Sequence, residues 1–390
     1  MKVAFLTVFL NHHQVPLCLA LAKYADEFTL ILTQALPEKA ESLGYHEMND
    51  AYDFILRTYD GSTPESKIEQ VIRDCDVVIY GGAPYHYYDL RKDDPRPSFI
   101  YIERFFRRGM LQKYYPKARK RIYQNASRYN RSNYFALCAS AFGSQDVSRC
   151  GFSLEKCFKW GYFPEVKALD ADELFSRKRH EKIHILWVGR LIWWKFPEDA
   201  VSLAEQLKEN GIAFSMEIIG EGDCEGMLAR KIAKEKLSDC VTLAGSMHPE
   251  DIRLHMEEAE IFVFTSGRKE GWGAVVNEAM SSGCAVVADA EAGSVPYLIE
   301  NGKDGFIYRS RSVSELYEKT VRLIKNPVER ERMGRAAYQK MKTLWNADEA
   351  AERLIKTCRD YKDGGVAPLY KDGPMSPAEY LKNNWFRDDC

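Results

Sequence analysis

A loop between two buried strands constrains this chain most. The apolar runs Ile261–Phe264 and Ala285–Ala288 are each typical of a buried strand. Between them lie a loop with two glycines, Gly271 and Gly273, and a helical stretch that ends at Gly283. Such a strand–helix–strand unit predicts an α/β fold with a parallel sheet flanked by helices. In open α/β sheets, ligands bind at the carboxyl ends of the strands, where this loop lies.

The residues of this loop favour an anionic ligand with hydroxyl groups. Glycines let the backbone approach a ligand closely, and the amides at a helix start attract an anion such as phosphate. Glu270 lies in the loop, and Glu278 lies in the second turn of the helix, where a carboxylate suits hydroxyls further along the same ligand. The candidate contacts of the loop are Gly271, Trp272, Gly273 and Ala274.

Two further strand ends carry candidate residues. The strand Ile185–Val188 leads into Gly189, Arg190 and, after a short turn, Lys195. A guanidinium grips phosphate oxygens bidentately and an ammonium acts as a point charge. The short strand Val241–Ala244 ends at Gly245.

In this order, the segments resemble the retaining glycosyltransferases of the group 1 (GT4-like) family, which have the GT-B fold. The two glutamates seven residues apart, with a Gly-aromatic-Gly after the first, are the signature, and Ala292–Pro296 and Glu300–Phe306 resemble its closing part. The resemblance implies that Arg190 and Lys195 bind a donor diphosphate. It also implies that Glu270 contacts the transferred sugar, that Glu278 contacts the ribose and that Gly245 lies near the base.

Two segments depart from the family pattern. Phe196 stands where the family usually has glycine after the lysine, and Phe9–Gln14 stands where the first loop is usually rich in glycine. For Trp193 and Trp194, a position in the domain core or cleft wall is favoured over a base-stacking role.

The first half shows the same alternation of strands and helices in outline. Two of its strand-to-helix loops carry histidines: Asn11, His12 and His13 after the first strand, and His86 after Val77–Tyr80. We expect Asn11, His12 and His13 on the acceptor side and treat His86 as a catalytic candidate, with a turn histidine without chemistry as the alternative.

The resemblance implies two facing Rossmann-like doubly wound domains. The expected division is an acceptor-binding domain at 1–165, a linker at 166–182, a donor-binding domain at 183–345 and a helical tail at 346–390 that crosses back to the first domain.

Composition excludes several classes of protein. A chain of 390 residues with 45% hydrophobic residues can bury two cores, and no apolar run is long enough to span a membrane. The net charge of −2 gives no general sign of nucleic-acid binding. Ten scattered cysteines without a Cys-x-x-Cys pair favour reduced thiols in the cytoplasm and no zinc site.

The segment 104–131 is unusually basic. It holds ten Lys or Arg and no acid, interleaved with Phe105, Phe106, Tyr114, Tyr115, Tyr123 and Tyr129. A solvated helical face explains this, but cations with interfacial aromatics also suit an anionic membrane surface. The second interpretation predicts a peripheral protein on the inner face of the plasma membrane.

Together these features predict a retaining glycosyltransferase that moves a hexose-type sugar from a nucleotide-diphosphate donor, UDP favoured, to a saccharide or lipid-linked acceptor. Family prevalence suggests bacterial surface polysaccharide assembly. We expect no cofactor and no metal, because Arg190, Lys195 and the helix start supply positive charge. The alternatives are a nucleotide-sugar epimerase or hydrolase on the same fold, and a non-catalytic sugar-nucleotide-binding or membrane adaptor protein.

Overall fold

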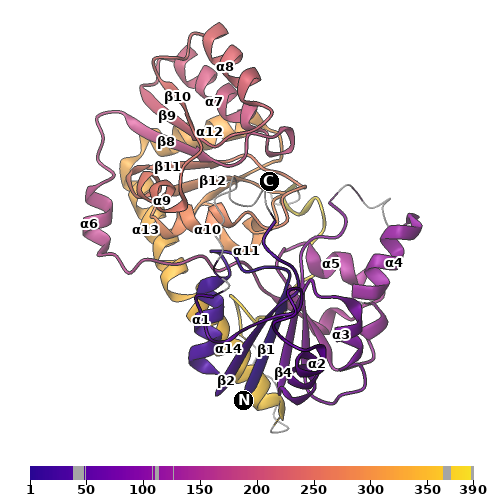
Figure 1. Ribbon diagram of the computed structural model, residues 1–390. Helices are drawn as coiled ribbons and strands as arrows, with labels where there is room; N and C mark the ends of the chain where they lie inside the picture. Colours follow the sequence, from indigo (N-terminus) through magenta and orange to yellow (C-terminus); the bar gives the residue numbers. More distant parts are fainter. Residues whose placement is uncertain are drawn as a thin grey trace. The chain divides into compact units, whose positions relative to one another are not determined.

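The computed structural model describes residues 1–37, 48, 50–107, 109, 114–125, 127–362 and 370–387. The chain forms two compact units, each built on one parallel sheet (Figure 1). Unit 1 comprises Met1–Glu165 and Leu344–Lys382, and unit 2 comprises Val166–Thr343 with the described residues from Asn383 onward.

Unit 1 contains a seven-stranded sheet in the order β3-β2-β1-β4-β5-β6-β7. Its strands are β1 (Lys2–Thr7), β2 (Glu27–Leu32), β3 (Ile55–Arg57), β4 (Val77–Gly81), β5 (Ser98–Ile102), β6 (Tyr134–Cys138) and β7 (Cys157–Lys159). Its helices are α1 (Val15–Tyr24), α2 (Glu65–Asp74), α3 (Tyr85–Asp89), α4 (Pro116–Asn125), α5 (Gly143–Ser148) and α14 (Ala347–Lys362). Helix α14 packs on α1, so this part of the tail joins the first domain as the resemblance implied (Figure 1).

Unit 2 contains a six-stranded sheet in the order β10-β9-β8-β11-β12-β13. Its strands are β8 (Ile183–Val188), β9 (Phe214–Ile219), β10 (Val241–Gly245), β11 (Ile261–Phe264), β12 (Ala285–Asp289) and β13 (Phe306–Tyr308). Its helices are α6 (Ala171–Ser176), α7 (Pro197–Glu209), α8 (Glu225–Lys234), α9 (Pro249–Glu258), α10 (Ala274–Ser281), α11 (Val295–Leu298), α12 (Val313–Lys325) and α13 (Pro327–Thr343).

The hydrophobic runs become strands because both faces of each sheet are covered. In unit 2, α7 packs against α8 and α12, whereas α10 packs against α9 and α13. The strands β11 and β12 are therefore buried along their whole length. Continuous apolar strands of this kind are the mark of parallel sheets between two helical layers.

The segment expected as a linker, 166–182, is instead part of unit 2. It contains α6, whose Leu174 and Phe175 are buried and pack with Tyr338. Lys178 is also buried, and its ammonium donates to the carbonyl oxygens of Met256 and Ala259. The polar composition suggested a solvated linker. Lys178 is nevertheless buried, because its ammonium donates to backbone carbonyl oxygens instead of to water.

The end of the chain differs from the expected tail as well. The described residues from Asn383 onward lie with unit 2, where Trp385 Nε1 donates to the carbonyl oxygen of Ala290 (3.0 Å). Among the described parts of the chain, no helix combines the length and apolarity needed to cross a membrane.

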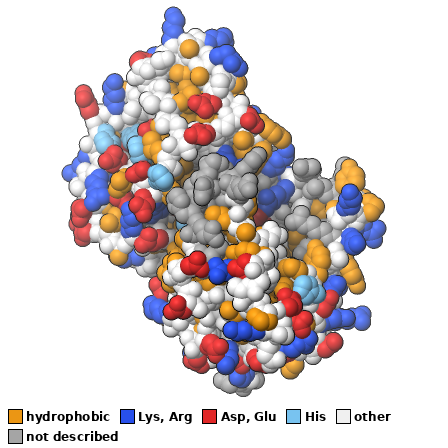
Figure 2. Space-filling model, viewed as in Figure 1, with side chains coloured by type: hydrophobic (Ala, Val, Ile, Leu, Met, Phe, Trp, Pro, Cys, Tyr) orange, Lys and Arg blue, Asp and Glu red, His pale blue; other side chains and the backbone are white. Residues whose placement is uncertain are grey.

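The basic segment 104–131 divides into core and surface. Phe106 and Tyr129 are buried, and Phe105 packs against the core of unit 1. The expectation of interfacial aromatics is therefore wrong for these three residues. Tyr114, Tyr115 and Tyr123, around α4, are 67%, 63% and 59% exposed. In the view of Figure 2, basic and hydrophobic side chains lie together over α4 at the right.

Candidate functional site

Two neighbouring loops of unit 2 carry most of the candidate residues. The strands β8 and β11 pair side by side at the point where the strand order reverses. The loop after β8 holds Gly189, Arg190 and Lys195, and the loop after β11 holds Glu270 through Gly273. This is the topological switch point of the sheet, the place where open α/β sheets bind their ligands.

A chain of hydrogen bonds fixes one loop on the other. Trp187 Nε1 donates to Thr265 Oγ1 (2.8 Å), and the Thr265 hydroxyl donates to the carbonyl oxygen of Lys195 (2.7 Å). Phe196 closes the β8 turn with φ 52°, in the left-handed region. Sequence reasoning missed Thr265, although a hydroxyl directly after a buried apolar strand was a signal that could have found it.

Lys195 and Glu270 meet at the centre of these loops. Lys195 Nζ lies 2.9 Å from Glu270 Oε2, and the two side chains are only 14% and 13% exposed. Two groups that the sequence assigned to phosphate and sugar thus lie at one place. A ligand that separates them must offer an anion to the ammonium and a donor to the carboxylate.

The two tryptophans of the β8 loop occupy different environments. The Trp194 ring is half-buried and lies near Arg190 and Lys195, whose cationic groups are 5.9 and 5.5 Å from its centroid. Trp193 is 61% exposed, which excludes the domain core and leaves the cleft wall of the two expected positions. Lys269 Nζ lies 3.5 Å from the Trp193 ring centroid. Such cation–π contacts set the orientation of an exposed ring.

The start of α10 is shaped by a glycine in the left-handed region. Gly273 has φ 91°, and a Cβ there would lie 2.7 Å from Phe264 Cζ. Trp272 is buried, and its Nε1 donates to Asn277 Oδ1 (2.8 Å), so its side chain anchors the helix start. The first amides of α10 point out of the helix toward the loop side, as at any helix N-terminus.

The closing segment of the signature supports the same loop. Gly293 N donates to the carbonyl oxygen of Glu270 (3.3 Å), and Ser294 N donates to that of Trp272 (3.1 Å). The conformation from Glu270 to Trp272 is therefore held from outside the loop. Preorganised amides of this kind need no rearrangement when an anion binds.

The remaining donor-side candidates lie further along unit 2. Glu278 is half-buried on α10, and its carbonyl oxygen accepts a hydrogen bond from Arg253 (2.8 Å). Gly245 ends β10, two strands away from β8, and its carbonyl oxygen accepts from Gly220 N (2.7 Å). The structure thus brings Arg190, Lys195 and Glu270 together on two adjacent loops. Gly245 lies at the carboxyl end of β10, two strands away from β8.

Unit 1 has a polar pocket of about 650 Å³ at the carboxyl ends of its central strands. It is lined by residues from β1, β4, β5, the loops after them, α3 and the segment after β7, namely Phe5, Gln14, Gly81, Gly82, Tyr88, Ile100, Tyr101, Ile102, Glu103, Arg104, Phe105, Arg107 and Tyr162. Glu103 accepts a hydrogen bond from the Tyr162 hydroxyl (2.8 Å) and pairs with Arg107.

The first loop of unit 1 adjoins this pocket through Gln14. Asn11 organises the loop, since its Oδ1 accepts from His13 N (3.1 Å) and its Nδ2 donates to Gln14 Oε1 (3.0 Å). The rings of His12 and His13 lie 3.8 Å apart and are half-buried. His86 is different: its exposed imidazole lies 3.3 Å from Glu65 Oε1, while Gly81, Gly82 and Tyr88 of the same segment line the pocket.

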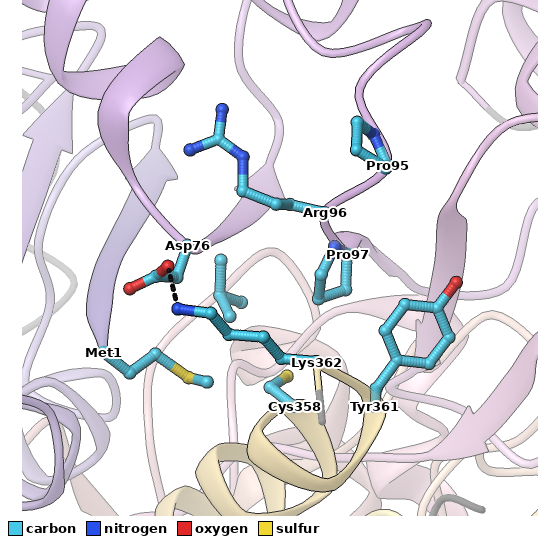
Figure 3. A pocket seen from close by; sticks show the side chains of 9 residues that line it. Met1, Asp76, Pro95, Arg96, Pro97, Cys358, Tyr361 and Lys362 are labelled. Carbon is cyan, nitrogen blue, oxygen red and sulfur yellow. Dashed lines mark hydrogen bonds and ion pairs between the residues drawn. The ribbon is translucent and has the colours of Figure 1, made fainter. Parts of the chain in front are cut away.

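A second, more apolar pocket of unit 1 lies at the opposite ends of the same strands, the amino ends of β1, β4 and β5 (Figure 3). Lys362 from α14 reaches across it to Asp76 Oδ1 (3.1 Å). Because ligands of doubly wound sheets bind at the carboxyl ends, this pocket is not the candidate site.

Comparisons with known proteins show similarity to glycosyltransferases. Residues 171–340 match the sequence model of the family described as "Glycosyl transferases group 1". The amylovoran biosynthesis glycosyltransferase AmsK of Erwinia amylovora is 33% identical over 182 residues, which are 45% of this chain and 44% of AmsK. The putative colanic acid biosynthesis glycosyltransferase WcaL of Escherichia coli K12 is 32% identical over 130 residues, 32% of each chain. The aligned part is less than half the length of either relative.

Solved structures resemble the whole chain. The crystal structure of Anabaena Alr3699/HepE in complex with UDP has a TM-score of 0.69 at 16% identity, covering 93% of this chain and 100% of that one. The apo form of the lipopolysaccharide outer core galactosyltransferase WaaB has a TM-score of 0.67 at 13% identity, covering 93% and 100%. At such identities the likeness shows the fold, and it confirms the expected GT-B architecture of two Rossmann-like domains.

Proposed function

We propose that this chain, whose residues 171–340 belong to the group 1 glycosyl transferases, transfers a hexose-type sugar from a nucleotide-diphosphate donor to a saccharide or lipid-linked acceptor. One observation carries the proposal. Lys195, Glu270 and the start of α10 converge at the switch point of unit 2, with Arg190 beside them. This arrangement offers cations and amides to a diphosphate and a carboxylate to the adjoining sugar.

The chemistry follows from charge. As the bond between sugar and phosphate breaks, negative charge grows on the leaving diphosphate. Arg190, Lys195 and the amides from Gly271 to Ala274 stabilise that charge where it develops. They supply positive charge without a divalent metal, so we propose that catalysis needs none. In the same site, Glu270 accepts hydrogen bonds from the transferred sugar and Glu278 from the ribose.

Retention of the anomeric configuration is part of the proposal. The acceptor hydroxyl attacks from the face that the diphosphate leaves, and a leaving phosphate oxygen takes its proton. This route needs no enzymic nucleophile or side-chain base. In this scheme His86 has no required role, which fits its exposed position beside Glu65.

The names of similar proteins support the donor and the pathway. Alr3699/HepE was solved with UDP and with UDP-glucose, so we propose UDP as the nucleotide. AmsK and WcaL are named for amylovoran and colanic acid biosynthesis, so we propose bacterial surface polysaccharide assembly as the pathway. In this pathway unit 1 holds the acceptor, with Asn11, His12 and His13 next to the pocket residue Gln14.

A thermal-shift titration with UDP, GDP, ADP and TDP, first without metal and then with Mg²⁺, tests the donor site. A nucleotide at 100 times its Kd stabilises the folded protein by about 2.7 kcal/mol. We expect metal-independent stabilisation by UDP that is lost in Glu278→Ala. No response to any nucleotide would contradict the proposal and favour a non-catalytic adaptor.

Product analysis with donor alone separates a transferase from the epimerase or hydrolase on the same fold. The transferase leaves the sugar of UDP-glucose unchanged in configuration and releases UDP quickly only when an acceptor is present. Rapid formation of free sugar or of an epimer without acceptor would favour the alternative.

A further inference from the structure

An exposed tryptophan stands beside the proposed donor site. Of the seven tryptophans of the chain, Trp160, Trp187, Trp272 and Trp345 are buried, Trp194 and Trp385 are half-buried, and Trp193 is 61% exposed. A tryptophan combines a large, rigid apolar ring with a negative face, which suits stacking on a ligand.

Trp193 is carried by a turn with a defined backbone, and Lys269 contacts its ring. It lies in the short 3₁₀ turn Trp193–Lys195, which Phe196 closes in the left-handed conformation. Lys195 N donates to the carbonyl oxygen of Ile192 (2.9 Å) within the same turn. Lys269 places its ammonium 3.5 Å from the ring centroid and so occupies one face. The opposite face is left for a ligand, at little cost in conformational entropy.

The position of the ring relative to the site restricts what it can bind. Trp193 adjoins the Lys195–Glu270 pair through both of its neighbours, Trp194 in sequence and Lys269 in space. That pair is about 14% exposed, whereas Trp193 is far more open to solvent. Gly245, where the base is proposed, ends β10, two strands away from β8. With the transferred sugar at Glu270 and the base near Gly245, as proposed above, the ring stands on the sugar side of the donor.

We propose that the open face of Trp193 stacks on a pyranose ring of the acceptor. The donor-binding unit would then also bind the acceptor saccharide, near the hydroxyl that attacks the transferred sugar. The inference rests on the proposed function, because the acceptor hydroxyl must approach the outer side of the sugar held at Glu270. The C–H bonds on one face of a pyranose carry partial positive charge and suit the negative face of an indole.

Saturation-transfer NMR tests this with defined probes: the methyl α- and β-glycosides of glucose, galactose and mannose, each added to protein saturated with UDP. The transfer to UDP in the same sample reports the donor site independently. We expect transfer to the ring C–H protons of at least one glycoside, strongest on one face of the ring. Trp193→Ala should weaken this binding about fivefold, and Trp193→Phe should retain most of it.

The matched control is Leu254→Ala, which removes a side chain of unit 2 that is 51% exposed on α9. This variant should leave the saturation transfer to UDP and to the glycosides unchanged. If UDP gives transfer but no glycoside does, or if Trp193→Ala leaves the glycoside signal intact, the inference about Trp193 is wrong. If UDP gives no transfer in the wild-type protein, the proposed function itself fails.

Discussion

At the scale of single residues, Gly273 sets the start of α10 beside the proposed donor site. Its φ of 91° and the 2.7 Å approach of a built Cβ to Phe264 leave no room for a side chain. Gly273→Ala should destabilise the fold by at least about 1–2 kcal/mol, because an L-residue is strained in this region. It should also abolish UDP binding by moving the start of α10.

Chemical denaturation and UDP titration of the same variant measure the two effects. Gly226→Ala is the control, since Gly226 lies on α8 and a Cβ there meets only the end of Arg230 at 3.6 Å. A Gly273→Ala protein with wild-type stability and UDP affinity would show that the helix start does not form the anion site.

A second residue-scale prediction concerns pH. Burial raises the pKa of Asp289, at the end of β12, from 3.8 to about 7. Between these values the folded state keeps a proton that the unfolded state has lost. The contribution of Asp289 to the free energy of unfolding therefore falls as pH rises from about 4 to about 7 and stays low above that window.

Asp289→Asn should remove this dependence, because an amide stays neutral and still bonds Ser310, which is 2.8 Å from Asp289 Oδ2. The Tm of the variant minus that of the wild type should rise from pH 4 to pH 7 and then level off. A difference that stays constant across the series would mean that Asp289 ionises in the folded protein as it does in the unfolded chain.

Sequence reasoning located single residues best where backbone and charge decide the role. Gly273, Lys195 and Glu270 stand together as the loop pattern indicated. The environment of Trp193 was not predictable, because the cation that orients it, Lys269, comes from a loop more than seventy residues away in the sequence. Contacts between loops depend on the register of β8 and β11, which no local pattern contains.

At the scale of elements, α14 is the helix that unit 1 receives from the C-terminal part of the chain. It follows α13 of unit 2 directly, yet it packs on α1 at the other end of the sequence. Leu354 on α14 is fully buried. Leu354→Ala should cost about 2–5 kcal/mol, as expected for a buried leucine that leaves a cavity.

Hydrogen exchange should show where that cost falls. We expect faster exchange in α1 and the strands of unit 1, with the strands of unit 2 unchanged. Leu323→Ala, at a fully buried position on α12, is the matched control and should affect unit 2 instead. Equal loss of protection in both units after Leu354→Ala would show that α14 does not belong to unit 1 alone.

Elements were predictable where periodicity was strong. The strands around the switch point of unit 2 appear within two residues of their expected bounds. The segment 166–182 was wrongly predicted to be a linker, because most of its residues are polar although two positions in α6 and Lys178 are buried. Burial of a lysine against carbonyl oxygens is a tertiary effect that composition does not reveal.

At the scale of the whole molecule, the surface around α4 carries a cluster of positive charges. Lys117, Arg119 and Lys120 are exposed on α4, next to the exposed Tyr114, Tyr115 and Tyr123. We propose that this surface binds anionic lipid, with each well-placed cation worth about 1 kcal/mol. Binding of this kind would bring the enzyme to a lipid-linked acceptor.

Liposome flotation tests the proposal. The triple variant Lys117→Ala, Arg119→Ala and Lys120→Ala should lose binding to vesicles with anionic lipid. The matched triple variant at exposed cations elsewhere in unit 1, Lys67→Ala, Arg73→Ala and Lys92→Ala, should keep it. Binding that does not depend on anionic lipid, or that both variants lose equally, would refute a specific role of α4.

The location of the donor site in unit 2 is the central claim, and amide chemical shifts test it most directly. In a titration of the isotopically labelled protein with UDP, we expect the largest shift changes at the amides from Glu270 to Ala274 and around Lys195. These changes should appear without Mg²⁺, and the pocket of unit 1 lined by Gly81 and Gly82 should respond less. Shift changes confined to unit 1, with the β8 and β11 loops unaffected, would contradict the account.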